Sequence, residues 1–158
     1  MTAPVTPTAD HSQDHGRLYG VGVGPGDPDL MTVKAVKRIG ASPVVAYFAA
    51  RNRVSNARRI ADGAIAVGTT ELRFDYPVTT ETLGPEDSYE QMMLRCYDES
   101  AALVEAELLA GRDVAVLCEG DPLFYGSYMY IHNRLAGRFT ATVVPGISSL
   151  TAGAAAIA

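Results

Sequence analysis

The sequence predicts an α/β fold in which a mostly parallel sheet is flanked by helices. Short apolar runs alternate with helical patterns along the chain, and the run Val114–Cys118 suits a strand buried on both faces. Leu18–Val23 leads into a glycine turn and then a helix, which is the order of elements that builds such a sheet. A length of 158 residues favours one domain with one core.

Composition narrows the classes of function. A formal net charge of -5 argues against a general nucleic-acid binder, which needs a basic face. No apolar run is long enough to cross a bilayer, and the first residues lack the pattern of an export signal. Cys96 and Cys118 do not have the spacing of a metal site or a disulfide framework. We therefore expect no membrane partner, no metal and a cytoplasmic location.

The first half of the chain begins with polar residues 1–16, which we expect to form a disordered tail. The helix that follows the first strand is capped by Thr32 and should place Val33, Val36 and Ile39 near one face. The predicted elements in order are a strand at Leu18–Val23, a turn at Gly24–Pro28, a helix at Val33–Ile39, and strands at Pro43–Phe48 and Glu71–Tyr76. Pro77–Pro85 is a connection too rich in Thr and Pro for regular structure.

The second half contains the longest predicted helix, Ser88–Ala110. Ser88 and Gln91 match a capping box, and apolar residues recur at three- and four-residue steps along the segment. The remaining predicted elements are a strand at Val114–Cys118, a helix at Ser127–Ala136, a strand at Thr140–Val144, and an alanine-rich helix start at Thr151–Ala158. Because that last helix has nothing to pack against, we expect the chain to be the amino-terminal part of something longer.

Two common nucleotide sites are disfavoured. The template G-x-G-x-x-G meets Pro25 when it starts at Gly20 and Asp27 when it starts at Gly22. No Gly-Lys-Ser/Thr follows the glycines, so a phosphate-binding P-loop is absent as well. His132 has no partner at catalytic spacing, and we interpret it as structural.

Polar groups and glycines gather where predicted strands end. Glu119, Gly120 and Asp121 directly follow a buried strand, and Ser148 and Ser149 stand where a helix should start. In open α/β sheets, ligands bind beyond the carboxyl ends of the strands. The acidic bend is therefore either part of a ligand site or an ordinary acidic loop.

A cluster of arginines is the best local candidate for holding a polyanionic substrate. Arg51, Arg53, Arg58 and Arg59 are four of the 13 basic residues. The planar guanidinium pairs well with carboxylates. The alternative is a solvated loop and helix face without a binding role.

Three stretches, residues 22–32, 119–126 and 143–149, resemble in order and spacing the tetrapyrrole methylases, the class III S-adenosylmethionine-dependent methyltransferases. The resemblance covers about residues 17–158. The intervening sequence, notably residues 45–49, 76–81 and 118–122, is most similar to the branch that methylates C20 of precorrin-2 in cobalamin biosynthesis, giving precorrin-3A. The alternatives are cobalt-factor II or another tetrapyrrole carbon as the substrate, or a non-catalytic ligand-binding or dimerisation module.

The resemblance implies a two-lobed α/β enzyme that holds S-adenosylmethionine between its lobes. Residues 17–150 would form the amino-terminal lobe, and residues 151–158 would start the connection to a carboxyl-terminal lobe that this chain lacks. Relatives are commonly homodimers. The family's donor contacts fall on Pro25, Glu119, Gly120, Asp121, Phe124, Ser148 and Ser149. Since part of the donor pocket belongs to the other lobe, we expect the chain alone to bind the donor weakly or not at all and to be weakly active or inactive.

The chain departs from the uroporphyrinogen methyltransferases of the family at one position. They carry an aspartate directly after the tyrosine of the second strand, whereas Phe48 follows Tyr47 here. No catalytic residue is therefore assigned. A sulfonium is already activated for methyl transfer, so catalysis can rest on alignment and exclusion of water. A proton must still leave C20, and the sequence does not identify its acceptor; Asp121 is interpreted as a binding residue.

Overall fold

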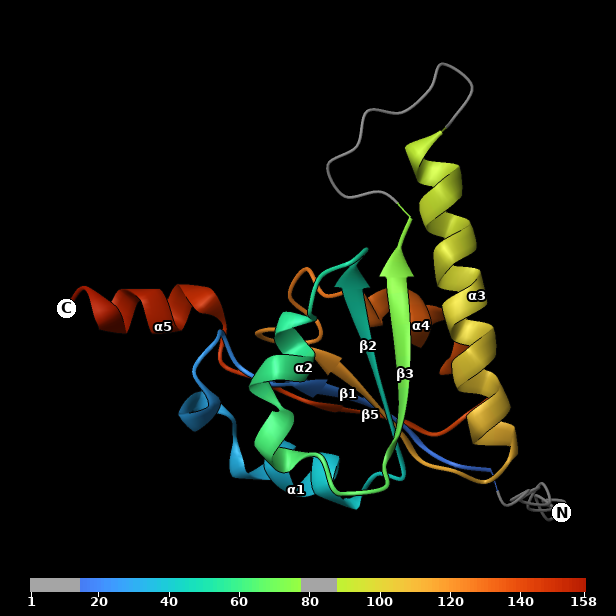
Figure 1. The fold of residues 1–158 in the computed structure, drawn as a ribbon, viewed down its shortest axis with the longest axis horizontal. Helices are drawn as coiled ribbons and strands as arrows, with labels where there is room; N and C mark the ends of the chain where they lie inside the picture. The colour runs from blue at the N-terminus through green and yellow to red at the C-terminus, as the bar shows by residue number, and fades with distance from the viewer. Residues whose placement is uncertain (1–14, 78–87) are drawn as a thin grey trace, which may run out of the picture.

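The computed structural model describes residues 15–77 and 88–158 (Figure 1). The predicted tail lies outside the described residues except for His15 and Gly16, and the predicted connection after Tyr76 lies outside them except for Pro77. Gly16 is held against the fold, because its N–H donates a hydrogen bond of 2.8 Å to the carbonyl oxygen of Leu108.

Five parallel strands form one sheet. They are β1 (Leu18–Gly22), β2 (Val44–Ala50), β3 (Thr70–Tyr76), β4 (Val114–Cys118) and β5 (Ala141–Val144). Their order across the sheet is β3-β2-β4-β1-β5, and every neighbouring pair is parallel. The predicted α/β class is confirmed. Since all strands run the same way, their carboxyl ends meet at one edge of the sheet.

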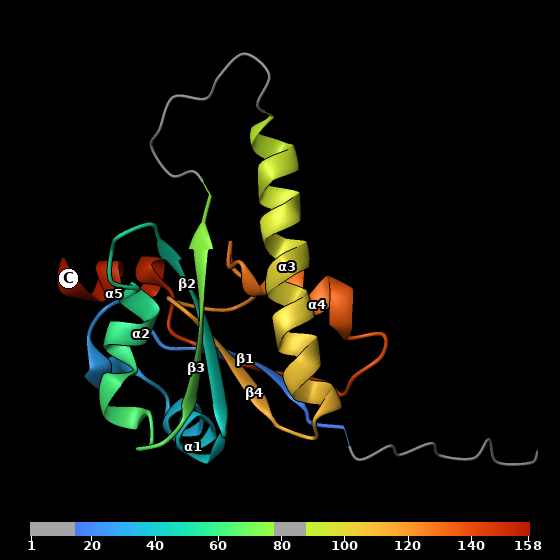
Figure 2. The ribbon, with the colours of Figure 1, turned by 45° about the vertical axis from the view of Figure 1, so that its right-hand side comes forward.

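Helices cover both faces of the sheet. In Figure 2, α1 (Val33–Ala41) and α2 (Asn56–Ile60) lie on one side, and α3 (Tyr89–Leu109) and α4 (Tyr128–Leu135) lie on the other. The sequence did not predict α2 as a separate element, because five residues are too few to show a period. The last helix, α5 (Ser149–Ala156), projects away from the sheet in Figure 1 and has no buried residue.

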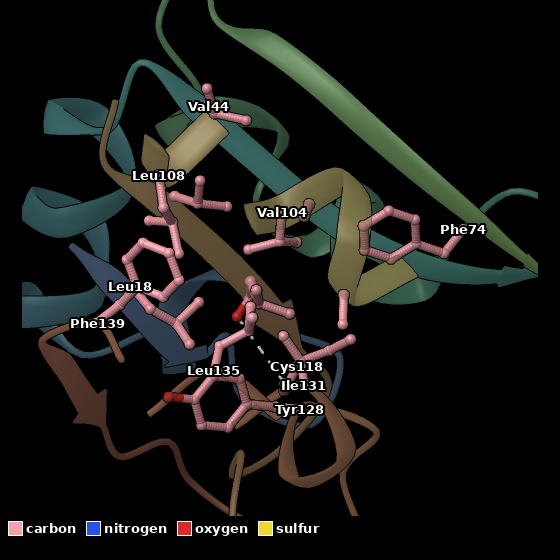
Figure 3. Close-up of a cluster of buried hydrophobic side chains, with 14 residues drawn as sticks. Leu18, Val44, Phe74, Val104, Leu108, Cys118, Tyr128, Ile131, Leu135 and Phe139 are labelled. Carbon is pink, nitrogen blue, oxygen red and sulfur yellow. Dashed lines mark hydrogen bonds between the residues drawn. The ribbon is translucent and has the colours of Figure 1, made fainter. Parts of the chain in front are cut away.

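The core is split between the two faces by the alternation of each strand. Along β1, Leu18 faces α3 and α4, whereas Tyr19 and Val21 face α1 and α2. Figure 3 shows the first of these clusters, in which Leu18 lies with Val104 and Leu108 of α3. Burial on both faces explains why β1, β2 and β4 are continuous apolar runs, whereas the edge strand β3 is mostly exposed and alternates with polar residues.

Helix starts follow the predicted caps. Ser88 Oγ accepts a hydrogen bond of 3.4 Å from the N–H of Gln91, and Thr32 Oγ1 accepts one of 3.1 Å from the N–H of Ala35. The predicted apolar stripe of α3 is buried and packs against β3, β4 and α4. His132 Nδ1 lies 3.1 Å from the hydroxyl of the fully buried Tyr128, which fits its structural interpretation.

The predicted apolar face of α1 is wrong in part. Val33 is 70% exposed and Val36 is 40% exposed, whereas Ala35 and Ile39 are fully buried. Residues four apart lie above one another on a helix, so Ala35 and Ile39 form the contact stripe. Val33 lies in the first turn and outside that stripe.

Candidate functional site

The turn after β1 and the turn after β4 are joined by backbone hydrogen bonds. The N–H of Gly120 donates to the carbonyl oxygen of Gly24 at 2.8 Å, and the N–H of Gly24 donates back at 3.4 Å. Both residues have positive φ, 81° at Gly24 and 69° at Gly120, which glycine adopts without a steric penalty. The two glycines thus bring distant parts of the chain together.

The bend after β5 is tied to the same place by Asp121. Its Oδ2 accepts a hydrogen bond of 2.9 Å from the N–H of Gly146, and its Oδ1 accepts one of 2.9 Å from the N–H of Leu123. One oxygen therefore holds the loop that contains Asp121, and the other holds the neighbouring bend. In this arrangement the carboxylate positions backbone.

Glycine backbones fill the floor of the site. A Cβ placed on Gly146 would lie 2.0 Å from the carbonyl oxygen of Gly120, and one on Gly22 would lie 2.6 Å from the same oxygen. No side chain fits between these segments. Gly22 and Gly146 were not among the site residues predicted from the sequence, although a glycine that recurs at equivalent strand ends is a signal of close backbone approach.

The seven residues predicted as donor contacts line one cavity of about 210 Å³. They are Pro25, Glu119, Gly120, Asp121, Phe124, Ser148 and Ser149. Ser148 also caps α5, because its Oγ accepts a hydrogen bond of 3.4 Å from the N–H of Thr151. The structure therefore brings all three predicted bends to one site.

A second cavity of about 550 Å³ lies at the carboxyl ends of β2, β3 and β4. Its side chains include Phe48, Arg53, Ser55, Asn56, Tyr76, Glu119 and Ser127. Glu119 is the one residue that lines both this cavity and the smaller one, among the residues the structure describes. The two cavities thus share one residue at the carboxyl end of β4.

Tyr76 and Ser127 form a hydroxyl pair in the wall of the larger cavity. Their oxygens lie 2.6 Å apart, and burial raises the pKa of Tyr76 to about 12, so the phenol keeps its proton at neutral pH. Phe48 stacks on the Tyr76 ring with centroids 5.2 Å apart. This pair was not predicted from the sequence, although Tyr76 lies at the end of a predicted strand.

The four predicted arginines do not line the larger cavity together. Arg53 lines the larger cavity, whereas Arg51 and Arg59 are exposed and lie outside its lining. Arg58 is paired within the fold: its Nε and Nη2 donate to Glu71 at 2.7 and 2.9 Å, and its Nη1 donates to Asp62 at 2.6 Å. These contacts explain Arg58 as a residue that ties α2 to β3.

The Arg58–Glu71 pair should make stability depend on acid pH. Hydrogen bonds from Arg58 hold the pKa of Glu71 below its ordinary value, so the pair stabilises the fold above the unfolded pKa and loses that effect as the pH falls. We expect Glu71→Gln to lower the free energy of unfolding at neutral pH, with the difference from wild type shrinking as the pH falls from about 5 to about 3. Urea unfolding at several pH values measures this difference.

Glu99→Gln is the matched control, because Glu99 is exposed on α3 and lines neither cavity. It should change stability little across the same pH range. A Glu71→Gln difference that stayed constant down to about pH 3 would contradict the assigned pairing.

Residues 15–77 and 88–158 contain no cluster of three or more His, Cys, Asp or Glu residues able to hold a metal ion. In the same ranges, no helix combines the length and apolar character needed to cross a membrane.

Comparison with known proteins gives three informative relatives. Precorrin-2 C(20)-methyltransferase of Sinorhizobium sp is 52% identical over 136 residues, covering 86% of this chain and 56% of that protein. Cobalamin biosynthesis protein CobIJ of Mycobacterium tuberculosis is 48% identical, covering 90% of this chain and 28% of that protein. Cobalt-precorrin-2 C(20)-methyltransferase of Salmonella typhimurium is 27% identical, covering 89% and 56%. The chain thus spans 56% of the length of the Sinorhizobium protein and 28% of the length of the Mycobacterium protein.

Solved structures agree with this match. The cobalt precorrin-4 methyltransferase CbiF has a TM-score of 0.64 and 29% identity, covering 89% of this chain and 49% of that one. Uroporphyrin-III C-methyltransferase of Thermus thermophilus, complexed with S-adenosylhomocysteine, has a TM-score of 0.59 and 26% identity, covering 88% and 48%. The family model described as Tetrapyrrole (Corrin/Porphyrin) Methylases matches residues 17–158. The chain therefore belongs to the tetrapyrrole methylases.

Proposed function

We propose that this chain is the donor-binding lobe of a methyltransferase that moves the methyl group of S-adenosylmethionine to C20 of precorrin-2, giving precorrin-3A in cobalamin biosynthesis. The observation that carries the proposal is the 52% identity to a precorrin-2 C(20)-methyltransferase over 136 residues. The joined strand ends support it, because they supply a polar site at the edge of the sheet where ligands of α/β proteins bind.

The smaller cavity suits part of the methyl donor. Ser148 and Ser149 offer hydroxyls, the bends offer backbone amides and carbonyls, and Pro25 and Phe124 offer apolar surface. Its volume of about 210 Å³ is below the roughly 300 Å³ at which whole-ligand pockets begin. Within the described residues, this lobe therefore encloses only part of the donor, which fits the expectation of weak binding by the chain alone.

The larger cavity suits the flat, acidic tetrapyrrole. Phe48 and Tyr76 provide aromatic surface, and the guanidinium of Arg53 can pair with a peripheral carboxylate of the substrate. Arg53 is the one member of the sequence cluster that the structure places on this wall. We therefore propose that Arg53 is the principal arginine that binds the substrate. Arg58 is assigned a structural role, because it pairs with Glu71 and Asp62.

Reversing the charge at this position should weaken substrate binding. We expect Arg53→Glu to raise the KM for precorrin-2 about tenfold or more, since each factor of ten corresponds to about 1.4 kcal/mol and a charged hydrogen bond contributes about 1.5–3 kcal/mol. Steady-state kinetics on the protein made from its complete reading frame measures the change.

Arg95→Glu serves as the charge-matched control, because Arg95 is exposed on α3 and lines neither cavity. Its KM should stay near that of the wild type. If the two variants raised KM equally, a general electrostatic effect would replace the proposed contact.

The substrate is proposed to be metal-free. The chain is 52% identical to the Sinorhizobium precorrin-2 enzyme and 27% identical to the Salmonella cobalt-precorrin-2 enzyme, over similar shares of its length. This difference favours precorrin-2 over a cobalt-bearing ring.

Cys96 and Cys118 are both free thiols, which fits the reducing cytoplasm in which we place the reaction.

One experiment separates the enzyme from a non-catalytic module. The product of the complete reading frame is incubated with S-adenosylmethionine and with precorrin-2 or its cobalt form, and the products are identified by mass spectrometry. The Sinorhizobium enzyme is the positive control. Precorrin-3A from precorrin-2 is the expected result. A folded protein that binds the donor but methylates neither ring would contradict the proposed function. Faster methylation of the cobalt form than of precorrin-2 would identify the cobalt form as the substrate.

A further inference from the structure

Glu119 stands at the junction of the two cavities. It directly follows the last residue of β4, and it lines both the smaller cavity and the larger one. Its side chain is exposed, and its carboxylate makes no hydrogen bond or ion pair with the residues in 15–77 and 88–158. The other acid of this bend, Asp121, lines the smaller cavity alone, and both of its oxygens accept backbone hydrogen bonds.

The proposed reaction requires a proton acceptor near this junction. As C20 attacks the methyl carbon, the bond from that carbon to sulfur breaks and its electron pair stays on sulfur. A carbon–carbon bond forms from the ring electrons, so the tetrapyrrole becomes cationic and carries one hydrogen too many at C20. The C20–H bond must then break, returning its electron pair to the ring and giving a proton to a base.

Other polar groups on the wall of the larger cavity are poor bases at neutral pH. Arg53 already carries a proton, and the hydroxyls of Ser55, Tyr125 and Ser127 and the amide of Asn56 do not accept one. Tyr76 and Cys118 keep their own protons, because burial raises the pKa of each to about 12. Among the described lining residues, the carboxylate of Glu119 is the group that remains.

We propose that the side chain of Glu119 accepts the proton that leaves C20 after methyl transfer. This inference rests on the proposed function and assigns one of its steps. The exposed carboxylate can pass the proton to water, which returns the group to its anionic form for the next turnover. Its negative charge at the junction also favours the ring cation that forms on methyl transfer.

The test replaces the carboxylate by an amide of the same shape in the protein made from its complete reading frame. We expect Glu119→Gln to lower kcat for precorrin-2 about 100-fold or more, the usual contribution of a general base, with little change in donor affinity. Precorrin-2 with deuterium at C20 should give a larger isotope effect on turnover in the variant, because breaking the C20–H bond becomes limiting. Glu119→Asp should recover part of the lost rate.

Glu99→Gln removes an exposed carboxylate that lines neither cavity and should leave kcat unchanged. If the wild type is active and Glu119→Gln keeps a similar kcat with no added isotope effect, Glu119 is not the acceptor. If Glu119→Gln loses donor affinity but keeps kcat at saturation, the side chain serves donor binding only and the inference also fails. A wild type that binds the donor but yields no precorrin-3A would overturn the proposed function first.

Discussion

Replacing Gly146 with alanine is expected to abolish measurable donor binding and to destabilise the fold. The added Cβ would lie 2.0 Å from the carbonyl oxygen of Gly120 and 2.8 Å from Cα of Gly22. Both contacts are with backbone, so relief requires the bend after β5 to move away from β1 and β4. Overpacking of this kind costs about 1–3 kcal/mol, and here the movement also opens the proposed donor site.

Two measurements check this expectation. Urea unfolding gives the loss of stability, and isothermal titration of the protein made from its complete reading frame with S-adenosylmethionine gives the donor affinity of the folded variant and of the wild type. Gly153→Ala is the matched control, because no atom lies within 4 Å of the added Cβ and alanine favours a helix over glycine by about 1 kcal/mol. The donor affinity and the free energy of unfolding of Gly153→Ala should stay close to those of the wild type. A folded Gly146→Ala protein with wild-type affinity would show that the joined bends do not hold the donor.

Asp121→Asn is expected to weaken donor binding about tenfold or more and to lower stability. The wild-type carboxylate accepts from the N–H groups of Gly146 and Leu123 at 2.9 Å each. An asparagine amide can accept at one of these sites but presents N–H groups at the other. Leaving a backbone donor unpaired costs about 1–3 kcal/mol, which corresponds to roughly a factor of 5–150 in affinity when the bend moves to avoid that cost.

Asp98→Asn is a suitable control for this change. Asp98 pairs with Arg134 at 2.7 Å on the surface of α3 and lines neither cavity, and such exposed pairs contribute at most about 1 kcal/mol. Donor affinity should be unaffected. Equal donor affinity in Asp121→Asn and wild type would mean that the bend after β5 keeps its position without the carboxylate.

The fold was largely predictable from local pattern. Apolar runs indicated β1, β2 and β4, which are buried on both faces, and turn residues indicated the strand ends. The family resemblance then selected seven residues, and all seven line one cavity. What local pattern does not give is the order β3-β2-β4-β1-β5, which makes distant strands neighbours.

The features that were missed depend on that order. Tyr76 and Ser127 belong to different layers, and their hydroxyls meet only because β3 and α4 approach at the same end of the sheet. The four predicted arginines are close in sequence, but among them only Arg53 lines the larger cavity. Consecutive helical residues point about 100° apart, so Arg58 turns toward Glu71 while Arg59 stays exposed. Closeness in sequence did not place these side chains on one surface.

The central claim is that three sequence-distant bends form one donor site. A titration of the ¹⁵N-labelled chain with S-adenosylhomocysteine, followed by amide chemical shifts, tests it most directly and also detects weak binding. The amides of Gly24, Gly120, Gly146 and Ser148 should shift together with a single dissociation constant, while those of α3 stay in place. Shifts confined to one bend, or different constants at different bends, would contradict the claim.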